Sequence, residues 1–195
     1  MCGIIISNLD IPKSAFKYIE NRGPDNTNIV KYKDITFIHF LLHLTGSKTL
    51  QPLIDETDNI VIIFNGEIYN YKEILNDAKS DIYSIMYLYK KYGLDFTKYL
   101  DGEFTIVIFD FKQNLLLLLS DIFKTKPLFY NINNNNIVIS SYESTCNEIK
   151  KNKYDSIKPN ELLVYNLNDR KLIEKRKIYE FDLNQHKKNY DDYIK

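Results

Sequence analysis

Met1-Cys2-Gly3-Ile4-Ile5-Ile6 opens the chain and predicts a buried strand that begins directly after a cysteine. Consecutive β-branched aliphatic residues are typical of a strand that is buried on both faces. Such a strand would hold the terminus in place, whereas chain ends usually fray. Aminopeptidases trim an initiator Met when the next side chain is small, so Cys2 would become the first residue of the mature chain.

Cys2 would then carry a thiol and a free α-amino group on the same residue. A thiol is a weak nucleophile until a base removes its proton, and an α-amine with a pKa near ~8 can be that base. The sequence therefore makes Cys2 a candidate catalytic nucleophile. The alternative, a small buried cysteine without chemistry, stays open from this stretch alone.

Length and charge exclude several classes of partner. With 195 residues, the chain can bury a core without disulfides or structural metals. Its 26 basic and 26 acidic residues cancel, and no basic stripe or polybasic segment indicates a nucleic-acid or membrane partner. The apolar runs, such as Leu115 to Leu119, are too short to span a bilayer. Two cysteines, Cys2 and Cys146, give neither a disulfide framework nor a metal-ligand spacing. We expect a cytoplasmic protein without metal or cofactor.

Short strands and a few helices make up the predicted secondary structure. Ile60 to Phe64 is predicted as a buried strand that runs into an Asn65-Gly66 turn. Ser80 is expected to cap a helix over Asp81 to Tyr92, which Gly93 ends. The other expected elements are a strand at Cys2–Ser7, a short helix at Pro12–Asn21, strands at Asn28–Tyr32 and Ile35–Leu44, and three hairpins, Glu103–Asp110 with Leu115–Leu119, Pro127–Ile132 with Ile137–Ser141, and Glu161–Asn166 with Lys171–Ile178. This order predicts an α+β fold of stacked antiparallel sheets covered by helices.

The composition changes near the C-terminal end. We expect one domain over residues 1–182 and a polar tail or linker stub over residues 183–195, where polar and charged residues prevail. Such a tail would connect the domain to a further domain or to a partner.

Seven short segments, taken in order, resemble one family. They are Met1-Cys2-Gly3-Ile4, Arg22-Gly23-Pro24-Asp25, Gln51-Pro52-Leu53, Asn65-Gly66-Glu67-Ile68-Tyr69-Asn70, Ser80-Asp81, Leu100-Asp101-Gly102-Glu103-Phe104, and Asp121 with Lys126-Pro127-Leu128. This series resembles the class II glutamine amidotransferase domain of asparagine synthetases, an N-terminal-nucleophile hydrolase. The resemblance implies a four-layer αββα sandwich of two mainly antiparallel sheets. It also implies hydrolysis of the glutamine side-chain amide to glutamate and ammonia, which passes to a second active site.

The chemistry of these residues agrees with that activity. Amide hydrolysis needs a nucleophile, a proton shuttle and donors for the oxyanion. Cys2 would supply the first two, and the resemblance assigns the oxyanion donors to the Asn65 amide and the Gly66 backbone N–H. It assigns the grip on the substrate ammonium to Glu67 and Asp81. For Asp81, a plain helix-dipole role is the alternative.

This chain departs from the family at the position that binds the substrate carboxylate. Asparagine synthetases carry an arginine for the substrate carboxylate in the strand before Gln-Pro-Leu, and the equivalent position here is Leu41. In a strand His39, Leu41 and His43 would share one face, so His43 is a candidate donor for that carboxylate. A structural role for His43 is equally open. The two histidines show no third metal ligand.

Two further departures concern the partner. The family usually has an arginine before Asp121 and a glycine after Phe123, where this chain has Ser120 and Lys124. The chain also lacks a Ser-Gly-Gly-x-Asp-Ser pyrophosphate loop, so we expect no ATP site. An ATP-dependent synthetase chain or domain that accepts ammonia would be the partner. Two other hypotheses stay open: a regulatory or binding module that kept the fold, supported by Leu41, and a hydrolase for another amide, which the two substrate-binding acids disfavour.

Overall fold

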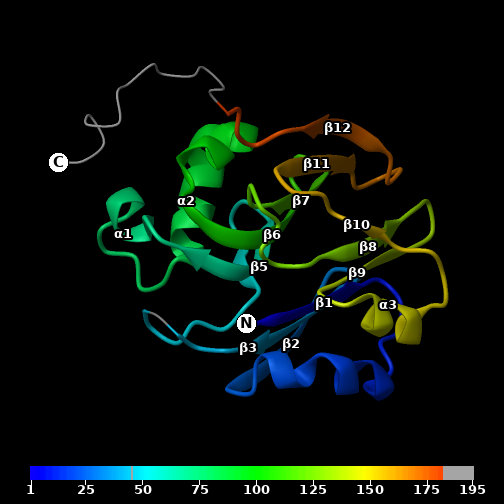
Figure 1. The fold of residues 1–195 in the computed structure, drawn as a ribbon. Helices are drawn as coiled ribbons and strands as arrows, with labels where there is room; N and C mark the ends of the chain where they lie inside the picture. Colours follow the sequence, from blue (N-terminus) through cyan, green and yellow to red (C-terminus); the bar gives the residue numbers. More distant parts are fainter. Residues whose placement is uncertain (45, 182–195) are drawn as a thin grey trace, which may run out of the picture.

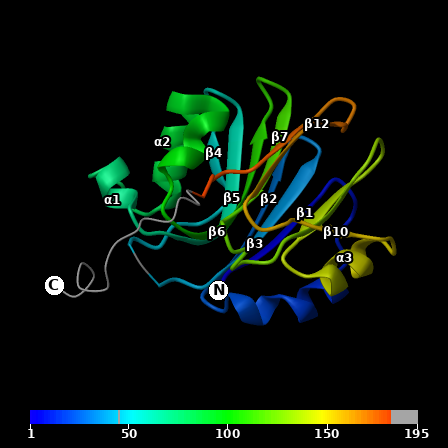
Figure 2. The same cartoon turned by 45° about the horizontal axis from the view of Figure 1, so that its top comes forward.

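The computed structural model describes residues 1–44 and 46–181 and consists of two stacked six-stranded sheets (Figures 1 and 2). All described strand pairs are antiparallel. The first sheet has the order β10 (Asp155–Ser156), β8 (Phe129–Ile132), β9 (Ile137–Ser140), β1 (Gly3–Ser7), β3 (Ile35–Leu41), β2 (Asn26–Tyr32). The second has the order β12 (Leu172–Arg176), β11 (Glu161–Asn166), β7 (Leu115–Ser120), β6 (Gly102–Asp110), β5 (Ile60–Ile68), β4 (Leu53–Asp55).

Helical segments cover the outer faces, which gives the four-layer α+β sandwich expected from the resemblance (Figure 2). The longest helix, α2 (Ile82–Tyr92), and the 3₁₀ segment η3 (Gly93–Tyr99) pack on the second sheet. Two 3₁₀ segments, η1 (Lys13–Tyr18) and η2 (Glu20–Arg22), and α3 (Glu143–Ile149) lie on the first sheet. The short α1 (Tyr71–Ile74) precedes α2.

Alternation along β5 shows how one strand serves two cores. Ile60, Ile62 and Phe64 face α2, while Val61 and Ile63 face the first sheet. Successive side chains of a strand point to opposite faces, so a strand between a helix and a second sheet must be apolar on both. The apolar run that predicted a buried strand is explained by this double burial.

β1 lies inside the first sheet, between the second sheet and the helical layer, and this fixes the position of Cys2. Ile4, Ile5 and Ile6 are fully buried between β3 and β9, as the opening sequence predicts. Burial of an isoleucine side chain is worth roughly 1.5–3 kcal/mol. Three in a row hold the chain end firmly against the sheet.

Several predicted boundaries are wrong. Asn65 and Gly66 lie inside β5 and form no turn, because the strand continues to Ile68. The predicted helix Pro12–Asn21 consists of two 3₁₀ segments, and the predicted strand Ile35–Leu44 ends at Leu41. Asp81, not Ser80, caps α2, and its side chain accepts a hydrogen bond from the Ile82 N–H. The helix itself ends at Gly93, as predicted, with φ +55°.

Two expectations fall at the limits of the described chain. The predicted tail, residues 183–195, lies outside the described residues. Among residues 1–44 and 46–181, no helix is long and apolar enough to cross a membrane.

Candidate active site

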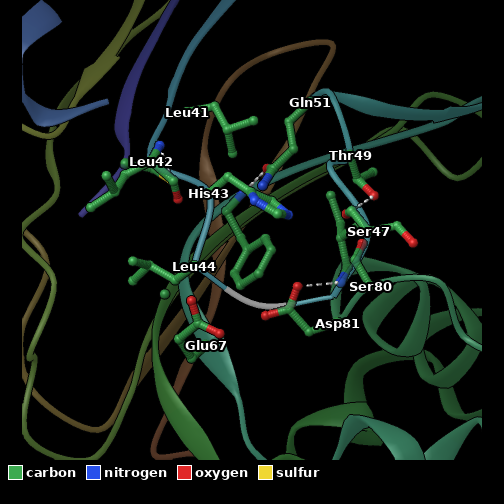
Figure 3. A pocket seen from close by; sticks show the side chains of 14 residues that line it. Leu41, Leu42, His43, Leu44, Ser47, Thr49, Gln51, Glu67, Ser80 and Asp81 are labelled. Carbon is green, nitrogen blue, oxygen red and sulfur yellow. Dashed lines mark hydrogen bonds between the residues drawn. The ribbon is translucent and has the colours of Figure 1, made fainter. Parts of the chain in front are cut away.

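Five of the six predicted site residues line a single cavity at the N-terminal end of β1 (Figure 3). They come from β1, β5, the start of α2 and the loop after β3, and are Cys2, His43, Gly66, Glu67 and Asp81. The sixth, Asn65, lines an adjoining cavity together with Cys2, Gly66 and Glu67. The fold thus gathers residues that are up to 79 positions apart in the sequence, from Cys2 to Asp81.

Cys2 is held by backbone groups of the neighbouring strand end. Its Sγ accepts a hydrogen bond from the Leu42 N–H at 3.4 Å and lies 3.6 Å from the Leu42 carbonyl oxygen. Burial raises the pKa of the Cys2 thiol, and the Glu67 and Asp81 charges add to this, while the Leu42 contact and the terminal amine act in the opposite direction. The resting thiol is therefore protonated near neutral pH and needs a base before it can attack.

Met1 precedes Cys2 in the structure and is half exposed, at 51%. The Cys2 nitrogen is therefore an amide here and would become an amine only after Met1 is removed. The exposure of Met1 leaves it accessible to an aminopeptidase.

Arg22 contacts the residue that bears the thiol. Its Nε donates to the Cys2 carbonyl oxygen at 2.8 Å, and its Nη1 donates to the Tyr142 hydroxyl, also at 2.8 Å. The guanidinium also lies over the Tyr142 ring, 4.8 Å from its centroid. This arginine belongs to the Arg22–Asp25 turn and fixes the backbone of Cys2.

Asn65 and Gly66 present polar groups toward Cys2 from the middle of β5. Asn65 is 1% exposed, and neither its Nδ2 nor its Oδ1 has a hydrogen-bond partner within residues 1–44 and 46–181. Gly66 has φ +152°, and a Cβ built on it would lie 2.0 Å from the Glu103 carbonyl oxygen of β6. Only glycine fits where the two strands approach so closely.

Asp81 joins the first turn of α2 to β5. Its Oδ1 accepts from the Ile82 N–H at 3.0 Å and its Oδ2 from the Ile68 N–H at 3.2 Å. Burial raises the pKa of Asp81 to about 6, and the nearby Glu67 carboxylate contributes in the same direction. Figure 3 shows the Glu67 and Asp81 carboxylates on the same side of the cavity. A bound ammonium group would relieve the repulsion between them.

His43 and Leu41 both line the cavity, and Figure 3 shows His43 between Leu41 and the two acids. Leu41 is buried and apolar, so it offers nothing to a carboxylate. The His43 N–H donates to Asp25 Oδ2 at 2.8 Å, and its Nε2 lies 3.1 Å from the Gly46 carbonyl oxygen. The expectation that His43 shares a strand face with Leu41 is wrong, because β3 ends at Leu41 and His43 lies in the loop that follows. Its ring is engaged by the Gly46 carbonyl oxygen of that loop.

Sequence reasoning missed two polar residues of this cavity. The Ser80 hydroxyl is buried and has no hydrogen-bond partner among the described residues, whereas the sequence predicted a helix cap at this position. Gln51 Oε1 accepts from the Phe64 N–H at 2.7 Å and ties the loop before β4 to β5. Gln51 belongs to the Gln51-Pro52-Leu53 segment that resembles the family, and this resemblance was the sequence signal that could have identified it. No set of three or more His, Cys, Asp or Glu side chains in residues 1–44 and 46–181 could hold a metal ion.

Comparison with known proteins identifies the family of this chain. Residues 1–185 match the family described as glutamine amidotransferase domain. A probable glutamine-hydrolysing asparagine synthetase of Dictyostelium discoideum is 32% identical over 149 residues, which are 66% of this chain and 27% of that protein. Asparagine synthetase 2 of Bacillus subtilis is 34% identical over 151 residues, 67% of this chain and 20% of that protein. The chain therefore spans less than a third of the length of these two relatives.

Solved structures share the fold at low identity. The allosteric regulatory enzyme of purine biosynthesis matches 91% of this chain and 43% of its own, with a TM-score of 0.61 and 18% identity. Glutamine phosphoribosylpyrophosphate amidotransferase of B. subtilis matches the same shares, with a TM-score of 0.58 and 18% identity. Together, the sequence match over residues 1–185 and this shared fold show that the chain belongs to the glutamine amidotransferase domain family.

Proposed function

We propose that this chain hydrolyses the side-chain amide of glutamine through the Cys2 thiolate, and that it does so after loss of Met1. The observation that carries the proposal is the convergence of Cys2, the Asn65–Gly66 pair and two acids on two cavities that share Cys2, Gly66 and Glu67 in their lining. Glutamine fits this set because its α-ammonium suits Glu67 and Asp81 while its amide carbonyl suits Asn65 and Gly66. The named activity of the asparagine synthetase relatives, glutamine hydrolysis, supports the same substrate.

In the proposed reaction, the Cys2 amine takes the thiol proton and the sulfur attacks the side-chain carbonyl carbon. The negative charge that develops on the carbonyl oxygen is stabilised by the Asn65 Nδ2 and the Gly66 N–H. The amine returns the proton to the leaving nitrogen, so that ammonia departs and a thioester remains. Water then attacks the thioester, the C–S bond breaks, and glutamate leaves with the thiol restored.

The free amide of Asn65 has a physical reason in this mechanism. A buried polar group without a partner costs about 1–3 kcal/mol of stability. A donor kept free of protein partners can instead hydrogen-bond an oxyanion without first breaking another bond. Ser80, whose hydroxyl also lacks a described partner, is suited to contact the substrate in the same way.

The substrate carboxylate would be bound without the arginine that asparagine synthetases carry. Candidate donors that line the cavity are His43, Ser47 and Thr49. These donors predict weaker affinity than an arginine would give, because the guanidinium fork binds a carboxylate through two parallel charge-assisted hydrogen bonds.

The second product, ammonia, would pass to an ATP-dependent synthetase domain or chain in the cytoplasm. The relatives are asparagine synthetases, and this chain matches 27% or 20% of their length, so the proposed acceptor is a synthetase of that type.

The runner-up function is a binding or regulatory module that keeps the fold without turnover. Leu41 and the engaged ring of His43 are the observations that favour it.

Glutamate release from glutamine separates these functions. The protein with Met1 removed, verified by intact mass, should release glutamate and ammonia in equal amounts. Cys2→Ala should reduce release to background, while Cys146→Ala, which changes the other free cysteine in α3, should retain it. Binding of glutamine without any release by the processed protein would favour the module and contradict the enzyme.

A further inference from the structure

An ion pair between a buried lysine and a partly exposed glutamate lies beside the nucleophile and takes no part in the mechanism above. Lys126 Nζ lies 2.8 Å from Glu103 Oε1, and the two side chains are 8% and 35% exposed. Both residues line the second cavity, together with Cys2, Asn65 and Glu67. A buried lysine is uncommon, because moving an ammonium out of water is costly unless a partner compensates it.

The position of Lys126 is fixed by the surrounding chain. The buried Thr105 hydroxyl of β6 donates to the Lys126 carbonyl oxygen at 2.6 Å. The preceding residue, Thr125, donates from its N–H and hydroxyl to Asp121 Oδ2 at 3.0 and 2.5 Å. Asp121 is itself buried and also accepts from the Phe104 N–H. The loop therefore presents the ammonium from a rigid support.

Glu103 places a second negative charge next to Glu67, and the Lys126 ammonium can neutralise it. In the β5–β6 ladder, Glu103 is the direct partner of Glu67, the proposed ligand of the substrate ammonium. Like charges that face each other across two strands are destabilising. The repulsion also acts on the reaction, because every carboxylate near Cys2 opposes formation of the thiolate. Glu67 and Asp81 already act in this way on Cys2.

We propose that Lys126 is a positioning residue that neutralises Glu103, so that the negative charge beside Cys2 is limited to the two acids that the substrate ammonium compensates. This inference rests on the proposed function for its purpose, while the charge balance at Cys2 can be measured without turnover. When glutamine binds, its ammonium offsets Glu67 and Asp81. Glu103, on the side of the second cavity, is offset by Lys126 throughout.

Several charged or titratable groups face the Cys2 thiol. Besides Glu103 and Lys126, these are Glu67 of β5, Asp81 at the start of α2, Arg22 of η2, His43 of the loop after β3, and the terminal amine. His39 of β3 pairs with Ile4 of β1, two residues after Cys2. Burial lowers the pKa of His39 to about 4, so it stays neutral at the pH of the experiment. Only Lys126 and Glu103 change in the variants below.

The test is the rate of alkylation of Cys2 by iodoacetamide as a function of pH, with the adduct located by mass spectrometry. Three variants are compared with the wild type: Lys126→Met, Glu103→Gln, and both together. Lys126→Met leaves the Glu103 carboxylate uncompensated, so the rise in rate should move to higher pH by about one unit. Glu103→Gln leaves a cation beside the sulfur, so the rise should move to lower pH. In the double variant it should return to within about 0.3 units of the wild type.

Opposite shifts that cancel in the double variant cannot come from damaged packing. Lys126→Arg keeps the charge and should behave as the wild type, which checks that the loop tolerates substitution. Glutamate release at pH 7 should fall about tenfold in Lys126→Met, which is the rate equivalent of one pH unit, and recover in the double variant. A double variant as impaired as Lys126→Met, or no shift in any variant, would overturn the inference. If the wild type alkylates normally but releases no glutamate, the proposed function fails and the charge balance stands.

Discussion

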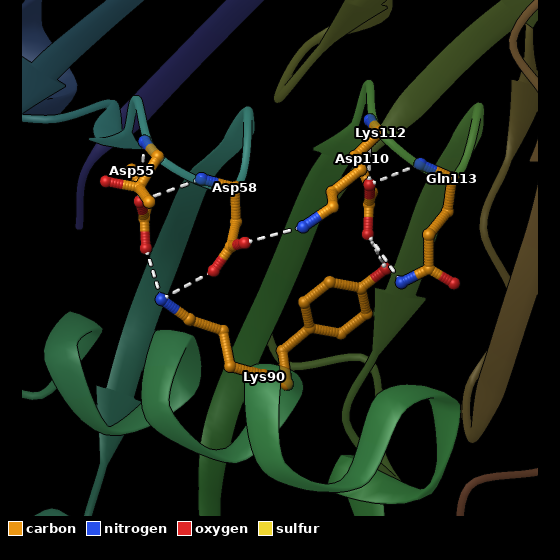
Figure 4. A network of polar contacts seen from close by, with 8 residues as sticks. Asp55, Asp58, Lys90, Asp110, Lys112 and Gln113 are labelled. Carbon is orange, nitrogen blue, oxygen red and sulfur yellow. Dashed lines mark hydrogen bonds and ion pairs between the residues drawn. The ribbon is translucent and has the colours of Figure 1, made fainter.

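Helix α2 has two ends with opposite electrostatics, although both are packed against β5. At its start, Asp81 is buried beside Glu67, and its pKa is raised to about 6. Near its end, Lys90 lies 2.6 Å from Asp55 and 2.8 Å from Asp58, and its pKa is raised to about 12 by these partners (Figure 4). The hydrogen bond from Lys90 lowers the pKa of Asp55. One end of the helix thus holds a carboxylate whose charge is disfavoured, and the other holds carboxylates whose charge is stabilised.

A buried carboxylate beside the second end completes the contrast. Asp110 at the end of β6 is 1% exposed and accepts hydrogen bonds from the Tyr89 hydroxyl at 2.9 Å, the Lys112 N–H at 3.0 Å, and the N–H and side-chain amide of Gln113 (Figure 4). At the Cys2 end, the side-chain polar atoms of Asn65 and Ser80 have no hydrogen-bond partner among the described residues. Satisfied polar groups stabilise the fold, while unsatisfied ones keep donors and acceptors ready for a ligand at some cost in stability. The two ends should therefore respond oppositely to substitution.

Asn65→Ala should strongly reduce turnover and have little effect on folding. Loss of one oxyanion donor costs about 3–4 kcal/mol of transition-state stabilisation, which corresponds to a fall in kcat of roughly 10²–10³-fold. The side chain makes no hydrogen bond to any described residue, so the urea midpoint should change little. Steady-state glutamate release and urea unfolding measure the two quantities. Asn131→Ala in β8, whose amide bonds the Lys153 carbonyl oxygen, is a control that should leave kcat unchanged.

Asp110→Ala should show the reverse pattern. Removal of a buried carboxylate that accepts four hydrogen bonds should lower the free energy of unfolding by about 3 kcal/mol. Glutamate release by the folded fraction should stay within about twofold of the wild type, because Asp110 lines neither cavity beside Cys2. If Asp110→Ala were as stable as the wild type and had lost turnover, the proposed contrast between the two ends of α2 would be wrong.

Asp81→Asn should raise stability while it weakens substrate binding. The pKa of Asp81 is higher in the folded state than its usual value of 3.8, so ionisation of this group destabilises the fold as pH rises through the window from about 4 to about 6. At pH 8 the amide should therefore be more stable than the acid by about 1–2 kcal/mol, since it loses one of two backbone hydrogen bonds but avoids the buried charge. Below pH 4 both side chains are neutral, and the gain should vanish. Urea unfolding at pH 8 and pH 4 checks the sign, and a gain at both values would contradict this origin.

Much of the fold was predictable because the strands alternate or run continuously apolar. Ile4 to Ile6 and the hairpin of β6 and β7 are buried as the sequence predicts, and Gly93 ends α2 as expected. The turn predicted at Asn65-Gly66 was wrong, because Asn-Gly is a common turn signal but lies inside β5 here. Here the glycine allows close approach of the Glu103 backbone inside a continuous ladder, which is a tertiary requirement that local sequence does not reveal. Helix α3 was missed because it is short and carries only two buried residues, Thr145 and Cys146.

The site was predictable as a set of residues and less so as a set of contacts. Family segments named Cys2, Glu67 and Asp81, and the structure brings them to one cavity. The pairing of Glu103 with Lys126 could not be predicted, because it depends on a loop whose backbone is fixed by Asp121 and Thr105. The free hydroxyl of Ser80 was hidden by its position before a helix, where serine usually acts as a cap.

Covalent labelling with a glutamine-like diazoketone tests the central claim most directly. The account predicts one adduct per chain on Cys2 of the processed protein, located by mass spectrometry. Excess glutamine should suppress it, and protein that retains Met1 should not form it. An adduct on another residue, an adduct on Cys2 that glutamine does not suppress, or full glutamine hydrolysis with Met1 still in place would contradict the account.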